Sequence, residues 1–149
     1  MNTHHALRFT LFWVLVFLTL LNAVSAVAGG IAMLVTGGLG MPYEFLASGP
    51  FRSFTVPGLV LVLVVGGTQA LALGLLLARR ESALLWTAVA GFGMVIWIAV
   101  EMAVVDAGSW LQTIFLVTGI VQLVIVLALL GVVRWLPRAS LADASHPAR

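Results

Sequence analysis

The sequence predicts an all-α membrane protein in which four transmembrane helices form an antiparallel bundle. The first observation is composition: 62% of the 149 residues are hydrophobic and 8% are charged, whereas about 25% of residues are charged in a typical soluble domain. The second observation is that four apolar segments reach the ~20 residues that a helix needs to cross a bilayer. These segments cover residues 9–36, 57–78, 83–105 and 109–133. A lipid bilayer is therefore the expected partner.

Short polar or glycine-rich breaks separate these segments. The two tight connections make the last three segments antiparallel to their sequence neighbours. Pro57 suits the first turn of the second helix, and Ser109 and Gln112 have the spacing of a capping box at the start of the fourth. The three breaks are residues 37–42, 79–81 and 106–108.

Arginine sets the predicted orientation. All seven basic residues are arginine, and Arg52 alone lies on its side of the predicted bundle. By the positive-inside rule, the crowded side and both termini are cytoplasmic. The exclusive use of arginine, with abundant Leu, Val and Ala, is compatible with a GC-rich bacterial genome, so we expect the bacterial cytoplasmic (inner) membrane. The arginines on the crowded side are Arg8, Arg79, Arg80, Arg134, Arg138 and Arg149.

We expect residues 1–136 to form one membrane domain and the small, polar residues 137–149 to be a disordered cytoplasmic tail. The first segment has a second interpretation, a signal peptide cleaved near residues 24–26. Its apolar character continues to Val35, which exceeds an ordinary signal-peptide core and favours an uncleaved span. The external loop over residues 37–56 has aromatic residues beside charges, which predicts a short interfacial helix near residues 42–47.

Three amide side chains lie at one depth of the predicted bundle. Asn22, Gln69 and Gln122 are each within about two residues, or roughly 3 Å, of the middle of their helix. They predict a buried hydrogen-bonded layer at mid-membrane. Its structural interpretation is helix–helix adhesion, worth about 0.6 kcal/mol per bond, and its functional interpretation is a layer for binding or permeation.

A single carboxylate, Glu101, lies inside an apolar segment. An ionisable side chain in hydrocarbon costs about 3 kcal/mol on insertion scales, which makes Glu101 the first candidate for a functional site. The alternative is that Glu101 reaches water or pairs with Arg52 for structural reasons. We expect a pocket open to the outer face, formed by Glu101, Gln112, Trp97, Thr113, Tyr43 and Arg52.

Several kinds of chemistry have no support in the sequence. The chain has no cysteine, which excludes disulfides, thiolate zinc sites and iron–sulfur clusters. The histidines, His4, His5 and His146, lack metal-ligand spacing, and we expect no metal, no cofactor and no catalytic residue. Seven scattered arginines form no face for nucleic acid.

The layout resembles that of a known group. Four short strings are similar to those of small four-span proteins of bacterial membranes: Pro57-Gly58, residues 66–69 (Gly-Gly-Thr-Gln), residues 97–101 (Trp-Ile-Ala-Val-Glu) and residues 109–112 (Ser-Trp-Leu-Gln). The size and hairpin layout of the chain loosely resemble the DoxX-like group. This resemblance implies a four-span membrane protein and brings no catalytic residues.

Three classes of function follow. The first is a non-enzymatic membrane protein or accessory subunit, with a membrane-protein partner or a second copy of itself. The second is a small proton-coupled transporter that uses Glu101 as the exchanged site. The third is an enzyme acting on a lipid or quinone with Glu101 as general acid or base. The third class lacks a second catalytic group, and we expect the first.

Overall fold

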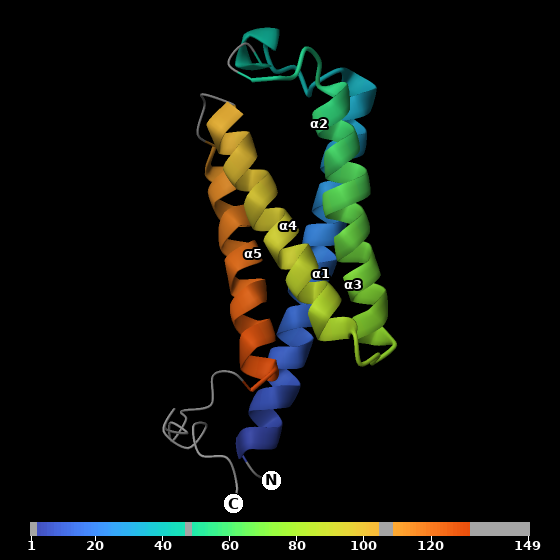
Figure 1. The fold of residues 1–149 in the computed structure, drawn as a ribbon, viewed down its shortest axis with the longest axis vertical. Helices are drawn as coiled ribbons and strands as arrows, with labels where there is room; N and C mark the ends of the chain where they lie inside the picture. Colours follow the sequence, from blue (N-terminus) through green and yellow to red (C-terminus); the bar gives the residue numbers. More distant parts are fainter. Residues whose placement is uncertain (1–2, 47–48, 105–108, 132–149) are drawn as a thin grey trace, which may run out of the picture.

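The computed structural model describes residues 3–46, 49–104 and 109–131, and it confirms the predicted all-α bundle (Figure 1). Within these residues, four helices are long and apolar enough to cross a membrane. The predicted tail over residues 137–149 lies outside the described residues. The elements are α1 (Thr3–Thr36), the 3-10 helix η1 (Tyr43–Leu46), α2 (Thr55–Leu59), the π-helix η2 (Val60–Gly66), α3 (Gly67–Leu77), α4 (Ala83–Val104) and α5 (Trp110–Leu129).

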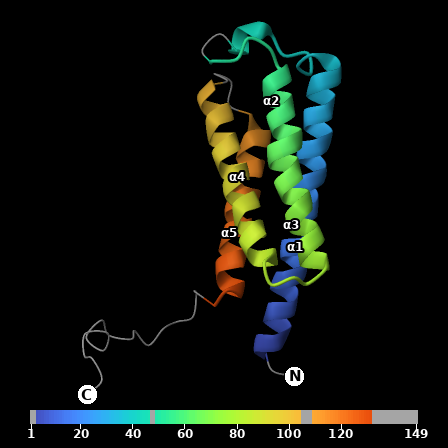
Figure 2. The ribbon, with the colours of Figure 1, turned by 45° about the vertical axis from the view of Figure 1, so that its right-hand side comes forward.

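The spans form a closed ring in which α2, η2 and α3 together make the second span. Each span packs against its neighbour in sequence, and α1 also packs against α5. Figures 1 and 2 show η1 and its flanking loop at one end of the bundle, here called the loop end, and the turn between α3 and α4 at the other. The second end is called the arginine end, because Arg79 and Arg80 form that turn.

Large apolar side chains cover the outside of every span. Phe17 on α1, Leu63 on η2, Ile96 on α4 and Val124 on α5 are each more than half exposed. Such a surface is suited to lipid, since exposing this much apolar area to water is unfavourable. The chain therefore has the architecture of a multi-pass integral membrane protein.

The helix ends follow local sequence signals. Gly37 and Gly38 have φ angles of 69° and 120°, and the Gly38 amide donates to the Met33 carbonyl at 2.9 Å, which caps α1 in a Schellman motif. Gly38 also touches the loop, because a Cβ there would lie 2.3 Å from Phe54 Cδ2. The predicted capping box at the start of α5 is present, with Ser109 as N-cap and Gln112 as its partner.

Some helix ends differ from the predicted bounds of the spans. The first helix begins at Thr3, six residues before the predicted residue 9, and the last ends at Leu129 rather than residue 133. Gly131 has a φ angle of 75°, which is left-handed and ends the helical path. The predicted interfacial helix exists in the described part of the loop as one 3-10 turn, η1.

The second span approaches α1 closely along its π-helical part. A Cβ on Gly30 of α1 would lie 2.5 Å from Val62 Cγ2 and 2.9 Å from the Gly58 carbonyl oxygen. Glycine lets two membrane helices come this near, which increases van der Waals contact. Pro57 lies in the first turn of this span, as predicted, and is buried there.

Candidate functional site

Gln122 of α5 is the centre of a hydrogen-bonded layer in the middle of the bundle. Its Oε1 accepts from Asn22 Nδ2 of α1 and from Gln69 Nε2 of α3, both at 3.1 Å. Its Nε2 donates to Gln69 Oε1 at 3.1 Å. All three amides are fully buried. Gln122 thus contacts both of the other amides that the sequence placed at its depth, and together Asn22, Gln69 and Gln122 form the amide layer.

Further contacts tie the amide layer to all four spans. Gln69 Nε2 donates to the Ala90 carbonyl of α4 at 3.2 Å, and Gln122 Nε2 lies 3.3 Å from the Thr87 carbonyl. Thr118 Oγ1 of α5 donates to Asn22 Oδ1 at 3.0 Å. Each amide nitrogen and oxygen in the layer thus has at least one protein partner. This geometry favours the structural interpretation, because a satisfied buried network stabilises one packing of the helices.

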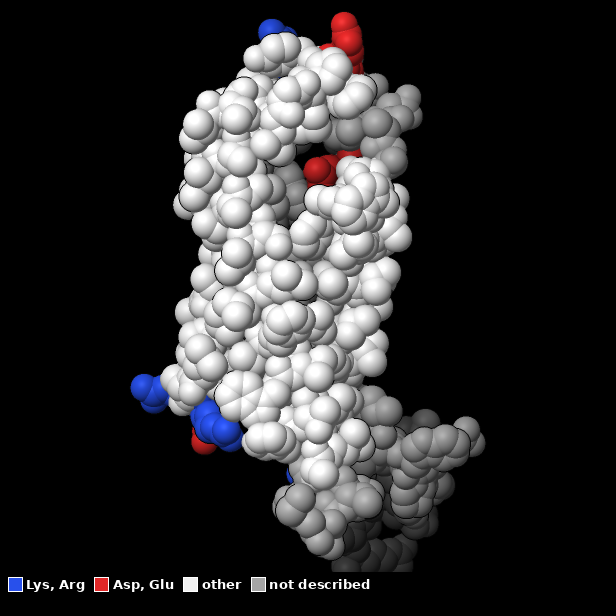
Figure 3. All heavy atoms as spheres, turned by 180° about the vertical axis from the view of Figure 1, so that it is seen from behind, with Lys and Arg blue, Asp and Glu red and all other residues white. Residues whose placement is uncertain are grey.

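A cavity of about 700 Å³ lies between the amide layer and the loop end. There α4 and α5 diverge from α1 and α2, as Figure 1 shows, and the loop around η1 covers the gap. Seen from behind, the surface has an opening near the loop end with acidic atoms inside it (Figure 3). The volume is in the range of ~300–1,000 Å³ that is usual for sites that bind small molecules.

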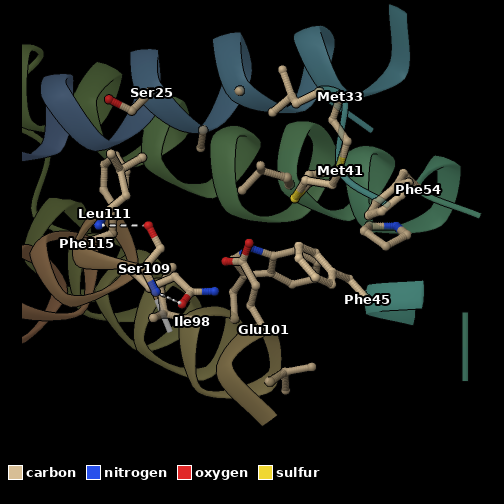
Figure 4. Close-up of a pocket in the computed structure, with 18 of the residues that line it drawn as sticks. Ser25, Met33, Met41, Phe45, Phe54, Ile98, Glu101, Ser109, Leu111 and Phe115 are labelled. Carbon is tan, nitrogen blue, oxygen red and sulfur yellow. Dashed lines mark hydrogen bonds between the residues drawn. The ribbon is translucent and has the colours of Figure 1, made fainter. Parts of the chain in front are cut away.

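Glu101 is the only charged residue among the described residues that line this cavity. Its carboxyl group points from α4 into the space between the helices, with Ser25 and Met33 of α1 across from it (Figure 4). It is partly buried and makes no hydrogen bond or ion pair with any described residue, Arg52 included. Burial of a carboxylate without a partner costs free energy, so a ligand that paired with Glu101 would be stabilised here.

Two hydrogen-bond donors also line the cavity without partners among the described residues. Trp97, one turn before Glu101 on α4, has a buried Nε1 that finds no acceptor. Gln112 of α5 is buried; its Oε1 accepts from the Ser109 amide at 3.0 Å, while its Nε2 has no such contact. A buried donor without a partner is uncommon in proteins, so the Trp97 indole nitrogen marks the cavity as unlike the amide layer.

The remaining walls are apolar and rich in aromatic rings. Phe45 and Phe54 come from the loop end, and Met41 comes from the same loop (Figure 4). Phe51 of this loop also lines the cavity. The opposite walls come from the four spans. The other aromatic residues on the walls are Trp97, Trp110 and Phe115, and the aliphatic ones include Ala26, Leu61, Met94, Ile98 and Leu111.

Three of the residues predicted for the pocket do not line it. Thr113 is exposed on α5, because one residue after Gln112 is a rotation of about 100° away from the cavity. Tyr43 is 67% exposed, with its ring 5.8 Å from that of Phe54, and so covers the outside of the loop. Arg52 is exposed and is not among the residues of the cavity walls. Glu101, Gln112 and Trp97 do share the cavity.

Several lining residues were missed by the sequence analysis. Trp110, for which the sequence predicted no place in the pocket, lines the cavity while remaining 72% exposed. Ser25 lies one turn from Asn22 on α1, and its position next to the predicted layer was the available signal. In the described ranges, no group of three or more His, Cys, Asp or Glu side chains is placed to hold a metal ion.

No family model matches the chain, and no curated protein or solved structure matches it either. The resemblance to small four-span bacterial proteins therefore stays a prediction.

Proposed function

We propose that this chain is a non-enzymatic protein of the bacterial cytoplasmic membrane, with cytoplasmic termini, that binds an amphipathic organic cation in the cavity around Glu101. The observation that carries the proposal is a lone carboxylate, without a described partner, inside a cavity of about 700 Å³ whose walls are apolar. The protein would act alone or as an accessory subunit that holds the ligand for a partner.

Electrostatics supports a positively charged ligand. A partly buried carboxylate among apolar walls gains most from a cation, because part of its hydration has been lost and the local dielectric is low. Aromatic rings attract cations through the negative faces of their π systems, and Trp is the strongest of them. Trp97, Trp110 and Phe45 line the same cavity as Glu101.

The position of the cavity supports a ligand that comes from the bilayer or its surface. The arginine bias favours an orientation with the loop end outside, in which the cavity would lie in the outer leaflet. The amide layer closes the path toward the cytoplasm, since its side chains are fully buried. An apolar body would rest against the walls, and the donors of Trp97 and Gln112 would hold an acceptor on the head group.

The test compares two ions of the same shape and opposite charge. Binding of tetraphenylphosphonium and of tetraphenylborate to the protein in nanodiscs is measured by calorimetry, with empty nanodiscs subtracted. We expect the cation to bind and Glu101→Gln to weaken its binding by at least about tenfold, since a buried charged contact is worth about 1.5–3 kcal/mol. The matched control is Glu44→Gln, which neutralises an exposed carboxylate outside the cavity.

Each other outcome has a clear meaning. Equal binding of both ions would show an apolar pocket without preference for charge, which contradicts a cationic ligand. Failure of both ions to bind, or an equal effect of the two Glu→Gln variants, would contradict binding in this cavity.

A proton-coupled carrier is the second candidate. The observation that favours it is η2, which contributes Leu61 to the cavity wall and ends three residues before Gln69 of the amide layer. Irregular π-helical turns often occur at functional sites. A carrier would take tetraphenylphosphonium into proteoliposomes in exchange for protons that leave down their gradient. This uptake would be lost in Glu101→Gln. Binding without uptake would leave the non-enzymatic binding protein as the function.

A further inference from the structure

A second cavity, of about 270 Å³, lies at the arginine end, far from Glu101. Three arginines line it: Arg8 from α1, and Arg79 and Arg80 from the turn between α3 and α4. No acidic residue is among the described residues that line it; Glu81 follows Arg80 in sequence and is exposed beside the cavity. Figure 3 shows basic atoms gathered at this end of the surface, with acidic atoms next to them.

The backbone holds Arg79 in an unusual conformation. Its φ angle is 49°, the left-handed region that glycine usually occupies after a helix. The Arg80 amide donates to the Leu75 carbonyl at 3.0 Å, and the Arg79 amide to the Leu76 carbonyl at 3.0 Å, so Arg79 is the residue that reverses the chain. A side chain in this region costs about 1–2 kcal/mol relative to the right-handed form.

A contact with α1 holds the Arg79 side chain at the cavity. Its guanidinium carbon lies 4.9 Å from the centre of the Phe12 ring, within the range of a cation–π interaction. Phe12 is one turn after Arg8 on α1. Two elements that are distant in sequence therefore bring guanidinium groups to one place. The positive-inside rule accounts for arginines at this end, but it does not account for their convergence on a single cavity.

The chemistry of the cavity matches one kind of ligand. Guanidinium groups bind phosphate oxygens through paired hydrogen bonds. The rest of the lining is apolar and comes from residues of the four spans: Phe12, Leu76, Ala83, Leu84 and Leu129. We propose that this cavity binds the phosphate of an anionic phospholipid of the adjacent leaflet, with an acyl chain against the leucines. Basic pockets between membrane helices recognise such head groups.

The test measures lipid binding by native mass spectrometry of the purified full chain. Phosphatidylglycerol and phosphatidylcholine with identical acyl chains are titrated separately, and inorganic phosphate is titrated as a third ligand. We expect phosphatidylglycerol to bind more tightly than phosphatidylcholine, and inorganic phosphate not to displace it. Arg79→Gln and Arg8→Gln should each weaken phosphatidylglycerol about fivefold, and Arg52→Gln at the loop end should not.

Arg79→Gly separates a binding role from a structural one. Glycine adopts the left-handed conformation without strain, so the variant should unfold in detergent at the same or a higher temperature. It should nevertheless lose about the same binding of phosphatidylglycerol as Arg79→Gln. The proposal is overturned if the two phospholipids bind equally, or if Arg79→Gly keeps full phosphatidylglycerol binding. Binding of inorganic phosphate alone with the same dependence on Arg79 would overturn the lipid as the source of the phosphate.

Discussion

The amide layer and the Glu101 cavity use similar polar side chains in opposite ways. In the amide layer, Gln122 contacts both Asn22 and Gln69, and every amide group has a protein partner. In the cavity, the Trp97 indole nitrogen has no partner in the described part of the chain. Both regions belong to the same four spans. The comparison shows that polar residues in a membrane bundle stabilise it where they meet, and are available to a ligand where the helices diverge.

This comparison predicts that stability depends on the amide layer and binding depends on the cavity. The largest expected effect comes from Gln122→Leu, which leaves Asn22 and Gln69 without their shared partner. Leaving buried polar groups unpaired costs about 1–3 kcal/mol each, and we expect a loss of about 3 kcal/mol in the free energy of unfolding. Reversible unfolding in mixed micelles, with sodium dodecyl sulfate as the denaturant, measures it.

The matched variant for that experiment is Glu101→Gln, which should leave the free energy of unfolding unchanged or raise it, because the side chain keeps its shape and the carboxylate makes no hydrogen bond or ion pair with a described residue. Equal losses in the two variants would contradict the division between a layer that stabilises and a cavity that binds.

A second, smaller effect is expected where α1 meets the second span. Gly30→Ala places a methyl group 2.5 Å from Val62 Cγ2 and 2.9 Å from the Gly58 carbonyl, so the helices must separate. Overpacking of this kind costs about 1–3 kcal/mol, and we expect about 2 kcal/mol in the same unfolding experiment. Gly74→Ala is the control, since a Cβ at that position would meet no neighbouring helix or side chain within 4 Å. A loss at Gly74 as large as that at Gly30 would contradict the close approach.

The smallest effect is expected at Trp97. Replacing it with Phe keeps an aromatic ring and removes the buried N–H that has no acceptor among the described residues, so stability should be unchanged or rise by about 0.5 kcal/mol. Affinity for tetraphenylphosphonium should fall about threefold, because Trp is the better ring for a cation. Calorimetry measures the affinity, and a fall in stability of more than about 1 kcal/mol would show that the indole nitrogen has a structural partner.

The sequence predicted the parts of the fold that depend on local signals. The spans followed from apolar length, the cap of α5 from Ser109 and Gln112, and the contact among the three amides from their common depth. Two partners of the layer were missed: Thr118, and Thr19, whose Oγ1 accepts from Gln122 Nε2 at 3.5 Å. An error of one residue in the assignment, a rotation of about 100°, is enough to separate an inward threonine from an outward one. The π-helix η2 was also missed, since a run of Leu and Val has the same apolar pattern in either helical register.

The cavity could be predicted only in part. Glu101 and Trp97 are four residues apart on α4, so helical periodicity placed them on one face. Gln112 was likewise placed on the inward face of its helix. The positions of Tyr43 and Arg52 depend on how the loop folds over the end of α1, where Met33, Leu46 and Phe54 pack together. That packing is a long-range contact that periodicity does not encode. The divergence of α4 and α5 from α1 and α2 likewise results from tertiary packing.

The most direct test of the boundary between the closed layer and the open cavity is cysteine reactivity, because the natural chain has no cysteine. Ser25→Cys lines the cavity, and Thr19→Cys lies at the fully buried level of the amide layer. The measurement is the rate of modification by N-ethylmaleimide in nanodiscs, relative to the rate after unfolding in sodium dodecyl sulfate. Rapid modification at position 25 and none at position 19 before unfolding is the predicted result. Similar rates at the two positions would contradict the account.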